Sequence, residues 1–170
     1  VVLRHSTNRG KGAALRTGIE HVLGNEGFDS AITMDADMQH DPNDLPAFIE
    51  AWSAQKADIL LGCRQRFGRG MPLHRILSNT ITSALVSAKT GVKIPDSQTG
   101  YRMIGRRVLE SVQFVSDGYE AETEFLLKAA RRGCRISSVP IATIYTGATS
   151  HMTHWRTTWR FLQVLLREYE

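Results

Sequence analysis

Cysteine is scarce in this sequence of 170 residues. Its two cysteines, Cys63 and Cys134, lie far apart and belong to no CxxC or Cys/His pattern, which argues against a disulfide framework or a zinc site. Long apolar runs are also missing, because no window approaches the roughly 18 uninterrupted apolar residues of a membrane span. The first twelve residues, VVLRHSTNRGKG, lack the order of a signal peptide. We therefore expect a reducing, cytoplasmic compartment.

The composition is that of an ordinary folded domain, with 42% hydrophobic and 22% charged residues. Lys and Arg exceed Asp and Glu by 21 to 17, which gives a formal net charge of +4. This mild excess suits an anionic small molecule or a lipid headgroup as well as a nucleic acid. Basic and aromatic residues do not interleave, so we expect no nucleic-acid partner. Repeats and linkers are absent, and residues 1–170 are expected to form one domain.

Apolar and amphipathic segments alternate along the chain, which predicts an α/β fold with a mostly parallel sheet. We predict strands at 31–35, 57–63, 98–105 and 135–145, and helices at 12–22, 43–54, 73–89, 105–113, 120–132 and 155–169. Residues 1–3 are expected to end a short buried strand. A domain seldom begins within such a pattern, so we expect an earlier part of the sheet to be missing; an N-terminal edge strand is the alternative.

Acidic residues follow the first of these strands, in AITMDADMQ. Ligands of open α/β sheets bind at the carboxyl ends of the strands, where Asp35 is expected. Asp37 and the amide oxygen of Gln39 follow at spacings of two, and Mg²⁺ uses such oxygen ligands beside water and phosphates. The acids therefore predict a metal site for a diphosphate substrate, although an Asp-x-Asp turn that merely begins a helix is the alternative.

The next polar residues have other predicted roles. Asp41 and Asp44, in DPND, are expected to begin the helix at 43–54. His40 is expected to be solvated or hydrogen-bonded, because a hard-oxygen metal site gains little from imidazole.

Cationic residues follow the second strand and precede the first helix. Arg64 directly follows the strand at 57–63, where a cation would meet the negative charge of a leaving diphosphate. Arg66 and Arg69 lie in the next loop, where they bind phosphate or only solvate the loop. Lys11 stands between Gly10 and Gly12 in NRGKG, a turn without the spacing of a Walker motif.

Two helices are amphipathic. In the helix at 73–89, apolar residues repeat at helical spacing, which predicts core packing. In the last helix, one face holds Trp155, Trp159, Leu162 and Leu166. We expect that face to dock on the sheet or on a missing transmembrane segment, and a membrane interface is the alternative.

The longer pattern of motifs resembles the family 2 glycosyltransferases, in particular the polyprenyl-phosphate glycosyltransferases of the dolichyl-phosphate mannosyltransferase type. The motifs are NRGKGAALRTG, MDADMQHDP, LGCR, SQTGYR and GYEAETEFLLKAARRGCRISSVPI, in this order. The resemblance implies a GT-A nucleotide-sugar fold and a divalent ion, Mg²⁺ or Mn²⁺. It also implies that the chain lacks the first strand–helix–strand portion of the domain, which in the family holds the nucleotide base and ribose.

The resemblance further implies roles for individual residues. The implied metal ligands are Asp35, Asp37 and Gln39; the implied catalytic residues are Asp37, Asp96 and Arg102; the implied donor contacts are Lys11, Arg64 and Gln98; and the implied acceptor contacts are Arg75, Ser78 and Asn79. It places Glu122 near the active site and the helix at 73–89 near a lipid acceptor and a membrane surface.

The function expected from these features is inverting transfer of a hexose from a UDP- or GDP-sugar to a polyprenyl phosphate. A phosphate acceptor is already anionic and needs no general base. The alternatives are a hydroxyl acceptor, with Asp96 or His151 as base, and a noncatalytic fragment. QTGYR differs from the Gln-x-x-Arg-Trp of processive synthases, which counts against polymerisation.

Overall fold

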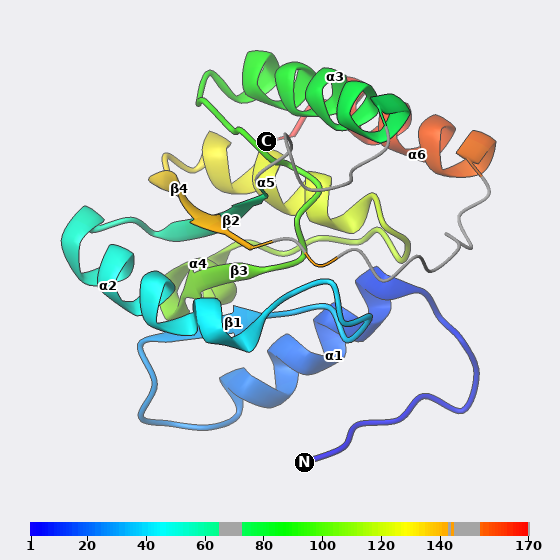
Figure 1. Cartoon of the computed structure of the whole chain (residues 1–170). Helices are drawn as coiled ribbons and strands as arrows, with labels where there is room; N and C mark the ends of the chain where they lie inside the picture. Colours follow the sequence, from blue (N-terminus) through cyan, green and yellow to red (C-terminus); the bar gives the residue numbers. More distant parts are fainter. Residues whose placement is uncertain (65–72, 143, 145–153, 170) are drawn as a thin grey trace.

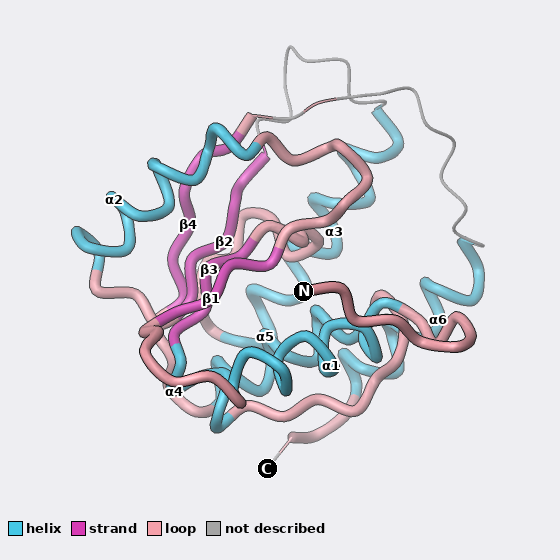
Figure 2. The backbone as a smooth tube through the Cα atoms, turned by 90° about the horizontal axis from the view of Figure 1, so that it is seen from below, coloured by secondary structure: helices cyan, strands magenta, loops and turns pink. Residues whose placement is uncertain are grey.

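The computed structural model describes residues 1–64, 73–142, 144 and 154–169. A four-stranded sheet lies between two layers of helices (Figure 1). Figure 2 shows the sheet nearly edge-on, with α2 on one side and α1, α3, α5 and α6 on the other. No helix in this part of the chain combines the length and hydrophobicity needed to cross a bilayer.

The elements follow one another in an α/β order. They are α1 (Lys11–Leu23), β1 (Ser30–Thr33), the 3-10 turn η1 (Pro42–Asp44), α2 (Leu45–Gln55), β2 (Ile59–Arg64), α3 (Leu73–Thr90), β3 (Arg102–Gly105), α4 (Arg106–Ser111), α5 (Ala121–Arg131), β4 (Ile136–Ile141) and α6 (His154–Leu166).

The sheet is mixed, with strand order β1-β3-β2-β4. β3 pairs antiparallel with both β1 and β2, whereas β2 and β4 are parallel. Three strands therefore run in one direction, and β3 runs against them. Arg102, the first residue of β3, is paired with Thr33 near the end of β1 and with Leu61 in β2. The start of β3 consequently lies at the sheet edge where β1 and β2 end.

Apolar residues of β2 serve two cores, one on each face of the sheet. Ile59 and Leu61 pack in the core beneath α5, and Leu60 packs with Phe48 of α2. All four side chains are buried. The three strand residues divide between the two cores because alternate residues of a strand face opposite sides. This double burial explains the continuous apolar sequence ILL, which is typical of a central strand.

One expectation about packing was wrong, and another is not met within the described residues. Residues 1–3 form no strand; Val1 and Val2 are largely exposed, since no described strand lies beside them to pair with. In α6, Trp159 and Leu166 are exposed, while Phe161 and Val164 enter the core. The described side chains of the tryptophan face of α6 are therefore not docked on the sheet, and docking on a further segment stays a prediction.

Candidate active site

The predicted site residues converge on one edge of the sheet. β1 and β2 end there, the loop at 96–101 enters β3 there, and the first turns of α1 and α5 border it. The reversal of β3 creates this arrangement, because the N-terminal end of a reversed strand meets the C-terminal ends of its neighbours. Side chains from five separate parts of the chain thus share one edge.

The acidic loop after β1 is anchored by His40. The buried ring of His40 accepts a hydrogen bond at Nδ1 from the backbone N–H of Asp35, with an N–N distance of 3.2 Å. Burial lowers the pKa of His40, which favours the neutral ring that this bond requires. The ring packs against Tyr101, with 5.1 Å between centroids. The prediction of a hydrogen-bonded His40 is thereby confirmed.

Asp37 is exposed at the tip of this loop, and Gln39 is half-buried. The backbone N–H of Gln39 donates to Asp37 Oδ1 at 3.1 Å, which closes an Asx turn. Between them Met38 has a φ of 65°, a conformation that non-glycine residues rarely adopt. Asp41 caps the following turn by accepting from Asn43 N at 2.9 Å, as predicted.

Lys11 reaches Asp35 because α1 begins close to the loop at 116–118. A Cβ on Gly12 would lie 2.2 Å from the carbonyl oxygen of Ser116, so only glycine fits. The backbone N–H of Gly12 donates to the carbonyl of Asp117 at 2.7 Å. From this start, Lys11 Nζ lies 2.8 Å from Asp35 Oδ1.

Arg64 and Asp96 form an ion pair in which Asp96 is buried and the Arg64 side chain is 15% exposed. Nε and one terminal nitrogen of Arg64 donate to the two oxygens of Asp96 at 2.7 and 2.9 Å. Asp96 also accepts from the backbone N–H of Gln98, and its side chain has no exposed surface. Both carboxylate oxygens are thus engaged, an environment for a residue that orients Arg64 and not for a general base. The side chain of Gln98 itself is exposed.

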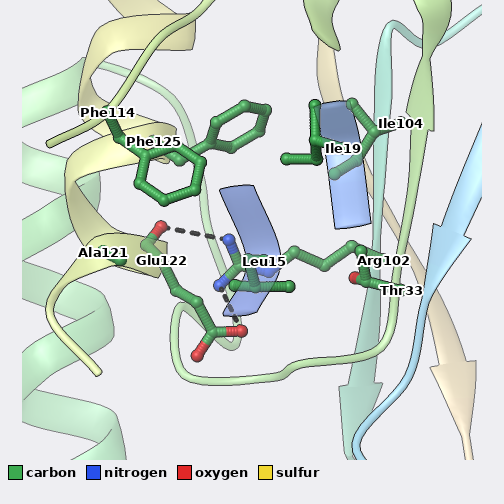
Figure 3. A pocket seen from close by; sticks show the side chains of 9 residues that line it. All are labelled: Leu15, Ile19, Thr33, Arg102, Ile104, Phe114, Ala121, Glu122 and Phe125. Carbon is green, nitrogen blue, oxygen red and sulfur yellow. Dashed lines mark hydrogen bonds and ion pairs between the residues drawn. The ribbon is translucent and has the colours of Figure 1, made fainter. Parts of the chain in front are cut away.

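Arg102 is enclosed by protein groups. Its guanidinium donates to the carbonyl oxygens of Thr99, Glu122 and Ser97 at 2.8, 3.0 and 3.0 Å, and the residue is 2% exposed. Figure 3 shows Arg102 beside a small, mostly apolar cavity, directed towards Glu122. In the structure Arg102 joins the loop at 96–101 to the start of α5, and its catalytic role stays a prediction.

The helix α3 turns polar residues towards the protein. The polar residues Asn79 and Ser83 are buried, together with the apolar Val86. Ser83 Oγ accepts from the backbone N–H of Ser97 at 3.0 Å, and Ser87 Oγ accepts from that of Ile94 at 2.9 Å. The apolar row of α3 is exposed and consists of Leu73, Leu77, Ile81 and Leu85. The expected core packing of this row is therefore wrong.

The expected acceptor residues lie on the first turns of α3. Arg75 is half-buried, Ser78 is exposed and Asn79 is buried. The remaining candidates, Arg66, Arg69 and His151, lie outside the described residues.

The oxygen ligands of the acidic loop fit a small divalent cation that keeps part of its shell for substrate. Asp35 and Asp37 are carboxylates on one short loop, and Asp37 is exposed. Within the described residues no group of three or more His, Cys, Asp or Glu side chains is arranged as a metal cluster. The part of the chain that the structure describes thus supplies no all-protein cage, but Mg²⁺ is commonly bound by one or two carboxylates with phosphates and water.

Sequence reasoning underestimated Glu122. Its carboxylate Oε2 lies 3.0 Å from Lys11 Nζ, and Oε1 lies 3.8 Å from a terminal nitrogen of Arg102. Acids in the first turn of a helix ordinarily stabilise that helix, so the sequence pattern did not indicate these ion pairs between distant residues of the chain. Gly100 was also missed: a Cβ there would lie 2.3 Å from Asp35 Oδ2.

Comparison with known proteins identifies relatives over most of the chain. A UDP-N-acetylglucosamine–dolichyl-phosphate N-acetylglucosaminyltransferase of Methanococcus voltae is 32% identical over 151 residues, which are 86% of this chain and 60% of the relative. An undecaprenyl-phosphate mannosyltransferase of Micrococcus luteus is 32% identical over 146 residues, 82% of this chain and 59% of the relative. The chain thus spans about three fifths of the length of these relatives.

Solved structures show the same fold. Glucosyl-3-phosphoglycerate synthase from Mycobacterium tuberculosis, crystallised with Mn²⁺, UDP and phosphoglyceric acid, matches with a TM-score of 0.68 and 17% identity over 98% of this chain and 55% of that chain. The likeness shows a GT-A fold. The sequence profile of the family "Glycosyl transferase family 2" matches residues 1–113, more than half of the chain. The chain therefore belongs to glycosyltransferase family 2.

Proposed function

We propose that this protein is a divalent-metal-dependent, inverting glycosyltransferase that moves a hexose from a UDP- or GDP-sugar to a polyprenyl phosphate. The observation that carries the proposal is the placement of two carboxylates, Asp35 and Asp37, and two cations, Lys11 and Arg64, at one sheet edge, where Lys11 pairs with Asp35. Carboxylates and cations together suit a metal–diphosphate group. The names of the relatives, which include dolichyl-phosphate and undecaprenyl-phosphate transferases, support the acceptor class.

In this proposal, Asp35, Asp37 and the amide oxygen of Gln39 hold Mg²⁺ or Mn²⁺. When bound, the cation neutralises the charge that accumulates on the leaving nucleoside diphosphate. Arg64 donates to a phosphate oxygen of the donor, and the two hydrogen bonds from Arg64 to Asp96 fix the direction of its guanidinium. The exposed side chain of Gln98 extends the donor site.

The reaction is a direct displacement at the anomeric carbon. An oxygen of the acceptor phosphate forms the new bond to C1 from the face opposite the diphosphate. The bond from C1 to the diphosphate oxygen breaks, and its electron pair leaves with the nucleoside diphosphate, so the anomeric configuration inverts. Because the acceptor is already anionic, no side chain must remove a proton. The full engagement of Asp96 by Arg64 and Gln98 agrees with a reaction that needs no base.

The acceptor lies, in this proposal, at the exposed side of α3. Arg75 and the exposed Ser78 contact its phosphate, whereas Asn79, the other expected contact, is buried. The exposed row Leu73, Leu77, Ile81 and Leu85 lies in the apolar surface of a membrane or beside the polyprenyl chain, which would remove these side chains from water. Trp159 of α6 is also exposed, and tryptophan is enriched at membrane interfaces. The protein is thus a peripheral membrane enzyme at the cytoplasmic face.

The test is transfer by the purified protein from UDP- and GDP-sugars to polyprenyl phosphate, with Mn²⁺ or Mg²⁺ and with a chelator. We expect product that is lost with the chelator and in Asp37→Ala. Asp41→Asn is the matched control, since Asn caps the turn equally well and activity should persist. Titration calorimetry with UDP, GDP and their sugars plus Mn²⁺ accompanies the assay.

Three outcomes would overturn the proposal in different ways. Transfer to saccharide hydroxyls with no response to polyprenyl phosphate indicates the other acceptor class. Donor binding without any transfer indicates a noncatalytic binding module. Failure to bind any nucleotide, with Asp37→Ala indistinguishable from the parent protein, would show that the acidic loop does not bind a metal–diphosphate group.

A further inference from the structure

Lys11 is shared by two carboxylates. Its Nζ lies 2.8 and 3.0 Å from the two oxygens of Asp35 and 3.0 Å from Oε2 of Glu122. The side chains of Lys11 and Glu122 are 19% and 8% exposed. Two carboxylates within 3.0 Å favour the charged form of an amine, so an ammonium covers both oxygens of Asp35.

Asp35 has little freedom to turn away from Lys11. Its backbone N–H is held by His40, and its carboxylate lies against Gly100, where an added Cβ would be 2.3 Å from Oδ2. Lys11, in contrast, has a flexible four-carbon stem and a second carboxylate partner. Arg102 fixes the backbone of Glu122 through a 3.0 Å hydrogen bond to its carbonyl oxygen, and a terminal nitrogen of Arg102 lies 3.8 Å from Oε1 of the Glu122 carboxylate. When a cation takes the oxygens of Asp35, the group free to move is the ammonium.

We propose that Lys11 is an exchangeable counter-ion for Asp35 and that Glu122 is the positioning residue that receives it. Without a divalent cation, Lys11 neutralises Asp35. When a cation binds Asp35, the ammonium leaves Asp35, keeps its bond to Glu122, and stays beside the diphosphate site. The proposal rests on the proposed function in one respect, the binding of metal by Asp35. It assigns to Glu122 a role that requires no contact with substrate.

The exchange makes a prediction that simple charge effects do not. Removing a nearby positive charge strengthens cation binding through space, and removing a negative charge weakens it, whether or not Lys11 moves. If Glu122 acts through Lys11, however, its removal matters only while Lys11 is present. A double-mutant cycle separates the two cases, because independent effects add and coupled effects do not.

The experiment is a titration of Mn²⁺ alone, without nucleotide, followed by calorimetry and by the electron paramagnetic resonance signal of free Mn²⁺. The proteins are the parent, Lys11→Met, Glu122→Gln and the double variant. We expect Lys11→Met to bind Mn²⁺ more tightly. We expect Glu122→Gln to bind it roughly tenfold more weakly in the parent background but within about twofold of Lys11→Met in the double variant. Arg16→Met, which removes a cation from the same helix, should leave the affinity within about twofold.

The outcomes are separable. An equal loss from Glu122→Gln in both backgrounds overturns the exchange but leaves the metal site intact. Mn²⁺ binding to Lys11→Met that equals or falls below that of the parent also overturns it, and this comparison remains decisive if Glu122→Gln fails to fold. No binding of Mn²⁺ by the parent protein, with or without nucleotide, overturns the metal site of the proposed function and the exchange with it.

Discussion

Arg64 and Asp96 are joined by two hydrogen bonds of 2.7 and 2.9 Å, and the side chain of Asp96 has no contact with solvent. Removing one charge from a buried pair leaves the other without compensation, which costs about 3 kcal/mol or more. We therefore expect Asp96→Asn to lower the free energy of unfolding by about 3 kcal/mol and to weaken donor binding. Urea denaturation and nucleotide titration measure both effects. A variant as stable as the parent, impaired only in turnover, would instead fit a general base.

Gly100 has no side chain and so leaves room for the carboxylate of Asp35. In Gly100→Ala the new Cβ would approach Asp35 Oδ2 to 2.3 Å, so the carboxylate must shift. We expect Mn²⁺ affinity to fall roughly tenfold or more. Gly18→Ala is the control, since a Cβ at this position in α1 meets nothing within 4 Å. It should keep full affinity and add about 0.5 to 1 kcal/mol of stability. Unchanged affinity in Gly100→Ala would contradict the geometry.

Glu124 ties α5 to the loop that α1 contacts. It accepts from the backbone N–H groups of Val115 and Ser116 at 3.1 and 2.9 Å and pairs with Lys128 at 2.7 Å. Burial alone raises the pKa of Glu124, but these hydrogen bonds outweigh burial and hold the pKa below the ordinary 4.5. The stabilisation is therefore present above the unfolded-state pKa and is lost as the pH falls through the folded-state pKa.

Glu124→Gln should accordingly lower the free energy of unfolding by about 1.5 to 3 kcal/mol near neutral pH. The gap between variant and parent should narrow in acid, as the parent loses the same charge. Urea denaturation at about pH 7 and about pH 3 checks both statements. Glu110→Gln, at an exposed pair with Arg106, should cost less than about 0.5 kcal/mol. A gap that widens in acid would show that the charge of Glu124 does not stabilise the fold.

The exposed row on α3 is expected to bind membranes. Leu77→Asp places a charge in the middle of this row, where Leu77 is 62% exposed. We expect its binding to anionic phospholipid vesicles, with and without polyprenyl phosphate, to fall roughly tenfold in a sedimentation assay. Ile49→Asp on α2 is the matched control, because Ile49 is 58% exposed but lies outside the row. Equal losses in the two variants would indicate a nonspecific effect of charge.

The parts of the fold that follow from local pattern were predictable. The apolar run of β2 ends at Arg64, and the acids follow β1, because strand ends are marked by the change from apolar to polar residues. The helix expected at 12–22 is α1, and the one expected at 73–89 is α3, each within a residue of its observed bounds. The placement of Asp35 at a strand end followed from these boundaries alone.

Other features depend on contacts between distant segments. RMIG was recognisable as a strand, but its direction is set by its pairing with β1 and β2. Arg102 was expected to contact substrate, whereas three carbonyl oxygens brought together by the fold surround it. The helical repeat of α3 predicted an apolar row but not the side on which it lies. That side was decided by Ser83 and Ser87, which bond to the loop before β3.

The number of residues between α3 and Arg102 determines how β3 is placed at the sheet edge that holds the candidate site. Successive residues of a strand face opposite sides, so a slip of one position would exchange the places of Arg102 and Met103. A deletion of one residue at 91–95 would alter none of the groups proposed to bind substrate. It would nevertheless draw Asp96 away from Arg64 or move β3 out of register. The geometry of the site therefore depends on the length of residues 91–95 as well as on the identity of the residues that form it.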